Sequence, residues 1–328
     1  MLSLDDVNLA QRATAGLVRH TPLQYSPSLS REIGAEIFLK LENQQVTGSF
    51  KARGPSNKLQ YLTPDQRKRG VVAATAGNHG IGLSHAGRRL GVPVHIHIAH
   101  SADQDKLEML RDNGAVLHFA RDFEEAHFDA LEAAERGGFT LVSAYSDPLI
   151  IASTGVVGLE ILADQPDIDL VVAPVGGGGL VAGISLVMKS GKRPIEVWGV
   201  EAANSPTFNT WVATGKPGRV ALQDSIAEGL AGFIEPETIT WPLVKKNVDR
   251  MTVASDAELI EGMRWMVTKH RMIVEPSGAA ALAAVWRDRD RIKGRRVAVL
   301  ISGGNVAWAR FLSLVEGRAE GLRSHSSP

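Results

Sequence analysis

The stretch GVVAATAGNHGIGLSHAGRRLGVPVHIHIA (70–99) contains one complete β-α-β unit. An apolar run after Gly70 is typical of a short buried strand, the turn TAGNHG (75–80) follows it, and a helical segment then ends at Gly91. A second apolar run, VPVHIHIA (92–99), completes the unit. Because two parallel strands need a crossover helix between them, this stretch predicts a parallel sheet covered by helices.

The same alternation continues along the chain. Helical segments at 102–113 and 123–136 alternate with apolar strands, of which the last is FTLVSA (139–144). After an irregular join near 145–150 the alternation resumes and runs to RRVAVLISGGN (295–305). We therefore predict an α/β protein of two lobes and expect a ligand in the cleft between them.

The composition of the 328 residues excludes several classes of protein. Lys and Arg number 36, as do Asp and Glu, so the chain lacks the positive charge that binds nucleic acids or anionic membranes. The absence of cysteine excludes disulfides, thiolate nucleophiles and zinc–thiolate sites. The acidic N-terminus does not resemble a signal peptide, and no apolar run approaches the ~20 residues of a membrane helix. We expect a soluble cytoplasmic protein with neither nucleic-acid nor membrane partners.

The turn PVGGGGL (174–180) lies between an apolar strand and an apolar helix and indicates a phosphate site. Glycines allow a tight turn that presents several N–H groups, and the start of the helix adds a partial positive charge. The turn also matches the dinucleotide fingerprint G-x-G-x-x-A through Gly177, Gly179 and Ala182, with Glu201 where a ribose-binding acid is expected. A phosphate-bearing cofactor and a nicotinamide dinucleotide both remain open on this turn alone.

Two further turns carry polar side chains at strand ends. In TAGNHG, the backbone amides with Thr75, Asn78 and His79 can hold a small anion such as a substrate carboxylate, and Asn78 can donate to a ring hydroxyl. In LISGGN (300–305), Ser302 ends an apolar strand at the edge where open parallel sheets bind ligands. Either turn can also be an ordinary helix cap, since Thr, Asn and Ser are good N-cap residues.

Lys51, within TGSFKARG (47–54), supplies the remaining chemistry. A lysine amine attacks aldehydes once burial or a neighbouring cation lowers its pKa, although a lone lysine is far more often a solvated surface charge. A phosphate cradle, a reactive amine, a donor to a ring hydroxyl and a partner for a ring nitrogen are together what pyridoxal 5′-phosphate needs. A nicotinamide enzyme would leave the S-F-K and S-G-G-N segments without a role.

Five motifs, in this order and spacing, resemble those of the fold-type II pyridoxal-phosphate enzymes: GSFKARG (48–54), AGNHG (76–80), GGGGL (176–180), EPSGA (275–279) and SGGN (302–305). The resemblance is greatest to the serine/threonine dehydratases, a group that includes serine racemases and threo-3-hydroxyaspartate ammonia-lyases. It implies a two-lobed, three-layer αβα fold of the tryptophan-synthase-β type. Residues 1–53 and 148–328 would form a large cofactor domain, and residues 54–147 a smaller inserted domain on the substrate side.

The resemblance also implies roles for single residues. Lys51 would bind the cofactor aldehyde covalently, Phe50 would lie against the ring, Asn78 would bond its 3′-oxygen, and Ser302 would face its nitrogen and act with Lys51 in catalysis. The phosphate would be held by Gly176, Gly177, Gly178 and Gly179. The substrate would meet Ser49, Thr75, Ala76, Gly77 and His79, and both Gly229 and Glu275 would lie near the ring.

The implied activity is β-elimination. A hydroxyl beside the ring nitrogen cannot keep that nitrogen charged, so the ring is a weaker electron sink and the substrate carbanion expels a β-group more readily. Lys51 would remove the α-proton, and a small β-hydroxy amino acid such as L-threonine or L-serine would yield a 2-oxo acid and ammonia. The alternatives are a lyase for threo-3-hydroxyaspartate or another specialised β-hydroxy amino acid, an NAD(P)-dependent oxidoreductase, and a non-catalytic ligand-binding relative. A homodimer or homotetramer is expected from the resemblance.

Two departures from the family pattern carry predictions. Racemases of the family have a serine at the position of Ala76, whose methyl group cannot transfer a proton, so we expect no efficient racemisation. A divalent-cation site would need an acid six residues after Glu201, where this chain has Thr207, so Glu201 is only a weak metal candidate.

Overall fold

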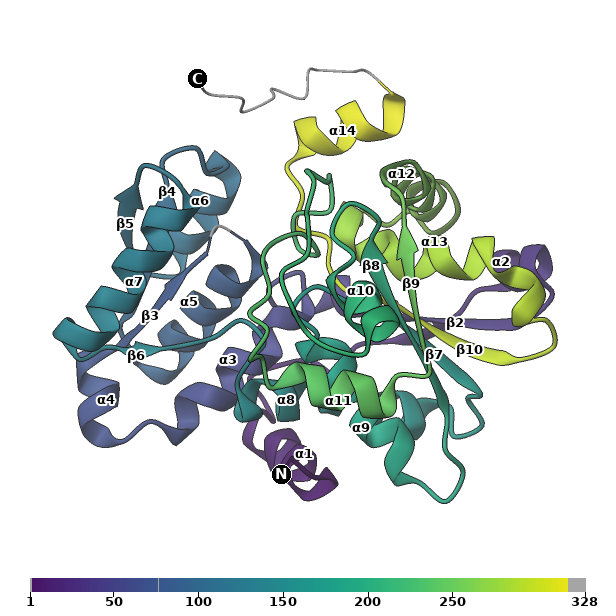
Figure 1. Cartoon of the computed structure of the whole chain (residues 1–328), viewed down its shortest axis with the longest axis horizontal. Coiled ribbons are helices and arrows are strands. Elements are labelled where there is room, and N and C mark those ends of the chain that lie inside the picture. Colours follow the sequence, from purple (N-terminus) through teal and green to yellow (C-terminus); the bar gives the residue numbers. More distant parts are fainter. Residues whose placement is uncertain (1, 76, 318–328) are drawn as a thin grey trace.

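Two sheets organise the molecule, for which a computed structural model describes residues 2–75 and 77–317 (Figure 1). The larger sheet has the spatial order β1 (Leu23–Tyr25), β2 (Glu36–Leu41), β10 (Arg296–Ile301), β7 (Leu170–Pro174), β8 (Glu196–Ala202) and β9 (Arg250–Ala254). Its strands are parallel except β1, which is antiparallel to β2. The predicted parallel α/β architecture is confirmed.

Helices cover both faces of the larger sheet because its central strands are apolar on both sides. In β10, Val297 and Val299 face one hydrophobic core, and Ala298 and Leu300 face another. The first core is closed by α2 (Pro27–Ile33), α12 (Asp256–Trp265), α13 (Ala280–Arg287) and α14 (Trp308–Glu316). The second is closed by α8 (Pro148–Asp164), α9 (Gly179–Ser190), α10 (Thr207–Thr214) and α11 (Thr240–Asn247), with α1 (Leu4–Ala13) packed outside on α8 and α9.

The second sheet has four parallel strands in the order β5 (Val116–Ala120), β4 (Val94–Ala99), β3 (Val71–Ala74) and β6 (Thr140–Leu141). Its helices are α5 (Asn78–Leu90), α6 (Gln104–Asp112) and α7 (Phe123–Gly137), and α3 (Arg53–Lys58) and α4 (Pro64–Arg69) lead into it. A separate hydrophobic core lies within this lobe. None of the helices in the described part of the chain is long and apolar enough to cross a membrane.

The strand predicted over 139–144 is shorter than expected. Only Thr140 and Leu141 form β6, because the chain then turns away from the sheet. The hydroxyl of Ser143 accepts hydrogen bonds from the N–H groups of Tyr145 (3.3 Å) and Ser146 (2.9 Å) and stabilises this turn. The segment therefore passes between the two lobes before α8 begins.

Candidate functional site

Lys51 lies in a short 3-10 turn (Phe50–Ala52) fixed against the end of β10. The N–H of Phe50 donates to the carbonyl of Ser302 over 3.1 Å, and Ser49 pairs with Gly303. Lys51 Nζ donates to the carbonyl of Ala144 over 2.8 Å and lies 5.1 Å from the centre of the Phe50 ring. Burial lowers the pKa of Lys51 to about 8, although the carboxylate of Glu275 partly offsets this. At pH 7 about a tenth of the amine is therefore neutral and nucleophilic, a far larger fraction than for an ordinary lysine.

The glycine turn between β7 and α9 requires glycine at several positions. Gly178 has φ +81°, a left-handed conformation that other residues rarely adopt. A side chain at Gly176 would begin 2.8 Å from the carbonyl oxygen of Gly229, which is too close. The hydroxyl of Thr240 holds the carbonyl of Gly177 over 2.9 Å. The turn thus leads directly into the N-terminus of α9, where free N–H groups favour an anion.

Asn78 and Glu275 meet between the lobes. Asn78 Nδ2 donates to Glu275 Oε1 over 2.7 Å, and Asn305 Nδ2 donates to Asn78 Oδ1 over 2.6 Å and to the carbonyl of Thr47 over 2.8 Å. Burial raises the pKa of Glu275 to about 7, against the lowering effect of the bond from Asn78. Asn305 belongs to the S-G-G-N motif but was given no role in the sequence predictions, and it orients Asn78 directly.

Several polar groups of the turn predicted to bind the substrate carboxylate, residues 75–79, are hydrogen-bonded within the protein. Thr75 Oγ1 accepts the N–H of Gly77 over 3.1 Å, so that amide already has a partner. A side chain added at Gly77 would have no atom of the described residues within 4 Å of its Cβ, apart from the chain neighbours of Gly77. His79 is buried and donates from Nε2 to the carbonyl of Val142 over 2.9 Å. Burial and the charge of Lys51 lower the pKa of His79 to about 3, so the ring is neutral. Ala76 lies outside the described residues.

Comparison with known proteins identifies the family. A model of pyridoxal-phosphate dependent enzymes matches residues 14–303 of the chain. The chain belongs to this family. Its cofactor is therefore pyridoxal phosphate, and the nicotinamide interpretation of the glycine turn is wrong.

Similar proteins cover almost the whole chain. L-Threonine ammonia-lyase of Thermotoga maritima is 40% identical over 93% of this chain and 76% of its own length. L-threo-3-Hydroxyaspartate ammonia-lyase of a Pseudomonas species is 34% identical over 96% of this chain and 99% of its own length. The structure of maize serine racemase superposes with a TM-score of 0.88 at 29% identity, over 96% of this chain and 97% of that one.

The residues of the site fit the cofactor of this family. The hydroxyl of Ser49 is fully buried and has no hydrogen-bond partner among the described residues, so the site retains polar capacity for a bound molecule. Ser302 is buried at the end of β10, beside the segment that carries Lys51. The N–H of Gly229 is held by the hydroxyl of Ser277 over 3.0 Å, which fixes the loop against Gly176.

Tyr145 is a site residue that the sequence predictions missed. A side chain at Gly177 would begin 2.2 Å from the Tyr145 ring, so this ring lies directly on the glycine turn. Its hydroxyl donates to Glu235, and burial and that carboxylate raise the pKa of Tyr145 above its ordinary value. Since Lys51 bonds the carbonyl of the preceding residue, Ala144, the segment 144–145 contacts both ends of the site. Its position at the join between the lobes was the only sequence signal for this role.

Glu201 is used for structure in this fold. Its carboxylate accepts the N–H groups of Phe208 and Asn209 and the side-chain amide of Asn209, each over 2.7 Å, and so caps α10. Burial raises the pKa of Glu201 to about 7, although these hydrogen bonds act in the opposite direction and lower it. Within residues 2–75 and 77–317, no group of three or more acidic or histidine side chains is arranged to hold a metal ion.

Proposed function

We propose that this protein is a pyridoxal-phosphate-dependent ammonia-lyase that converts a small β-hydroxy amino acid, L-threonine or L-serine, into a 2-oxo acid and ammonia. The observation that carries the proposal is the buried Lys51 amine, whose lowered pKa suits covalent and proton-transfer chemistry and whose segment is bound to the end of β10 through the N–H of Phe50 and the carbonyl of Ser302. The ammonia-lyases among the similar proteins support the same class of reaction.

Each part of the site has an assigned task in this proposal. The phosphate would be held by Gly176, Gly177, Gly178 and Gly179. Phe50 would lie against the ring, Asn78, Glu275 and Gly229 would line it, and Ser302 would face its nitrogen. The substrate would meet Ser49, Thr75, Gly77 and His79, together with Ala76, whose role is taken from the sequence resemblance. When bound, the cofactor withdraws electrons from the substrate Cα and so acidifies its proton.

Lys51 performs the proton transfer. The free amine of Lys51 would take the α-proton of a bound substrate, and a pKa of about 8 would let it do so near neutral pH. Ser302 is a hydroxyl and cannot hold a full positive charge on a nearby ring nitrogen, as an acid would. The resulting weaker electron sink favours departure of the β-hydroxyl over transamination.

The buried, neutral His79 adds no positive charge on the substrate side, which favours substrates with an uncharged side chain. A lyase for threo-3-hydroxyaspartate is the second candidate, since one similar protein carries that name. We also propose a cytoplasmic location and a homodimer or homotetramer, on the resemblance to the dehydratases alone, with residues 54–147 acting as the inserted domain.

An absorption spectrum and a keto-acid assay test this function. The purified protein should show a band near ~410–430 nm that borohydride removes and that Lys51→Ala lacks. Lys68→Ala, a change at an exposed lysine in α4, is the matched control and should keep the band. Keto-acid release from L-threonine and L-serine, compared with threo-3-hydroxyaspartate, then identifies the substrate. A coloured protein that releases no keto acid from any of the three would be a non-catalytic relative.

A further inference from the structure

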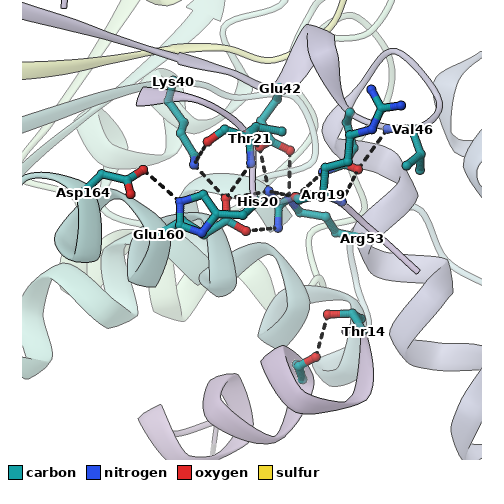
Figure 2. Close-up of polar contacts among 12 residues, drawn as sticks. Thr14, Arg19, His20, Thr21, Lys40, Glu42, Val46, Arg53, Glu160 and Asp164 are labelled. Carbon is teal, nitrogen blue, oxygen red and sulfur yellow. Dashed lines mark hydrogen bonds and ion pairs between the residues drawn. The ribbon is translucent and has the colours of Figure 1, made fainter. Parts of the chain in front are cut away.

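Four charged side chains, Lys40, Glu42, Arg53 and Glu160, lie together and contact one another (Figure 2). Lys40 lies in β2 and Glu42 directly follows this strand. Arg53 begins α3, and Glu160 lies in α8. Their exposed fractions are 0%, 0%, 1% and 4%. Burial of a charge is unfavourable unless it is paired, and these two cations and two anions balance. Each of the four therefore depends on the others.

Arg53 is the centre of this charge cluster. Its Nε and Nη2 donate to the two oxygens of Glu42 over 2.8 Å each, and its Nη1 and Nη2 donate to the two oxygens of Glu160 over 2.7 and 2.8 Å. Lys40 Nζ completes the cluster with an ion pair of 2.7 Å to Glu160. Because the guanidinium is planar and its N–H groups form a fixed fork, two bidentate pairs fix its position as well as its charge.

The cluster holds one side of the Lys51 segment, and β10 holds the other. Arg53 follows Lys51 by two residues, while the N–H of Phe50, the residue before Lys51, is bound to the carbonyl of Ser302. From a third side, α5 packs so closely that a side chain at Gly82 would begin 2.4 Å from the Lys51 carbonyl oxygen. The main chain of Lys51 is thus confined in three directions.

One helix connects this cluster to the glycine turn. Glu160 of α8 binds Arg53, and Thr154 of the same helix places its hydroxyl 2.8 Å from the carbonyl oxygen of Gly179. Six residues of α-helix correspond to about 9 Å along the axis. A rigid helix therefore spans the distance between the amine-bearing segment and the turn at the start of α9.

We propose that Arg53 is a positioning residue, which through Glu42 and Glu160 fixes the Lys51 amine relative to the glycine turn. This inference rests on the proposed function of Lys51. A loosened amine would still lie in the site but would attack the cofactor aldehyde and the α-proton from a less favourable geometry. Small misplacements of a reacting group are known to reduce rates by up to about a hundredfold.

Arg53→Lys tests the proposal, because it keeps the positive charge but cannot form both bidentate pairs. The protein is purified with its cofactor, and three quantities are measured: kcat and KM separately, the dissociation constant for pyridoxal phosphate, and the fraction of Lys51 fixed to the cofactor by brief borohydride treatment. We expect kcat to fall about tenfold or more with KM within about threefold, and the fixed fraction to fall with it.

Arg250→Lys is the matched control. Arg250 pairs with Asp288 over 3.0 Å and stacks on Trp198, but it lies in β9 at the far edge of the larger sheet. It should change kcat and the fixed fraction by less than about twofold even if the melting temperature falls. Thr21→Val is a milder variant, since it removes only the 2.5 Å bond from Thr21 Oγ1 to Glu42 and retains all four charges. It should change kcat and the fixed fraction in the same direction as Arg53→Lys, and by less.

If Arg53→Lys is folded and matches Arg250→Lys in kcat and in the fixed fraction, the positioning role is wrong. If Arg53→Lys does not fold, Thr21→Val decides, and its full activity and full fixation would overturn the proposal. If the unaltered protein is not fixed at Lys51 at all, the proposed function itself fails, and the two failures are therefore distinct.

Discussion

A hydrogen bond of 2.7 Å joins Asn78 to Glu275 across the two lobes, from an amide at the start of α5 to a carboxyl group just before a 3-10 turn (Pro276–Ala279) that leads into α13. Because burial raises the pKa of Glu275 to about 7, this carboxyl group is largely protonated in slightly acidic solution. A proton held by the folded state and released on unfolding makes stability depend on pH.

The sign of that dependence is definite. The pKa of Glu275 is raised from 4.5 to about 7 on folding. Its contribution to the free energy of unfolding is therefore fully present below about pH 4.5 and is lost as the pH rises through about 7. Glu275→Gln cannot titrate, so its free energy of unfolding should fall less between pH 5 and pH 8 than that of the unaltered protein. Urea titrations at both pH values measure the difference. Glu201 shares a raised pKa, so a smaller slope should persist in the variant, and an unchanged slope would contradict the assignment to Glu275.

The reactivity of Lys51 provides a second prediction. With the cofactor removed, acetylation of Lys51 in the folded protein should reach half its maximal rate near pH 8, because burial lowers the pKa of this amine. Mass spectrometry of the peptide that contains Lys51, compared at several pH values, gives the midpoint. The same peptide labelled in urea is the control and should have a midpoint near the ordinary lysine value of about 10.4. Coincident midpoints would show that the site does not perturb the amine.

The sequence predicted the fold and the family from local patterns. The unit at 70–99, the glycine turn and the apolar strands all depend on residues close in sequence, and the structure contains the predicted β-α-β unit. The predicted strand end is wrong because FTLVSA is apolar enough for a longer strand, whereas the hydroxyl of Ser143 stabilises a turn soon after Leu141.

The residues missed are those whose partners are distant in sequence. Arg53 and Glu160 are 107 positions apart, and nothing local distinguishes either from a solvated surface charge. Tyr145 contacts Gly177 only because the join between the lobes crosses the glycine turn. A single sequence shows secondary-structure propensities and local motifs, but it does not show which buried charges will be paired.

A third prediction concerns the shape of the glycine turn. Gly178→Ala forces a side chain into a left-handed conformation at a cost of roughly 1–2 kcal/mol, and the new methyl group would lie 2.7 Å from Phe208. We expect a lower melting temperature and an approximately tenfold weaker affinity for pyridoxal phosphate, measured by absorbance titration. Gly191→Ala, at the other end of α9, is the control, because its φ is −80° and its nearest neighbour would be 3.6 Å away. Equal effects of the two changes would argue against a phosphate role for the turn.

Tyr145 allows its ring and its hydroxyl to be tested separately. Tyr145→Phe loses the bond to Glu235 but keeps the ring on Gly177, whereas Tyr145→Ala loses both. We expect the phenylalanine variant to bind pyridoxal phosphate within about threefold of the unaltered protein, and the alanine variant to bind it about tenfold more weakly, a loss near 1.4 kcal/mol. The physical reason is that the ring shields the turn from water. Tighter binding by the alanine variant would mean that the ring instead obstructs the phosphate.

From the resemblance to the racemases, we propose that residue 76 determines whether a proton can return to the second face of Cα. In the proposed mechanism Lys51 acts from one side, and inversion of the amino acid needs a proton donor on the other, which the methyl group of an alanine cannot supply. Ala76→Ser introduces a hydroxyl at this position, and we expect a measurable rise in the conversion of L-serine to D-serine, followed by chiral chromatography, while keto-acid release continues. Ala76→Gly changes the size of the residue without adding a hydroxyl and should show no such rise. If the serine variant remains active in elimination yet forms no D-serine, residue 76 does not face the Cα from the side opposite Lys51.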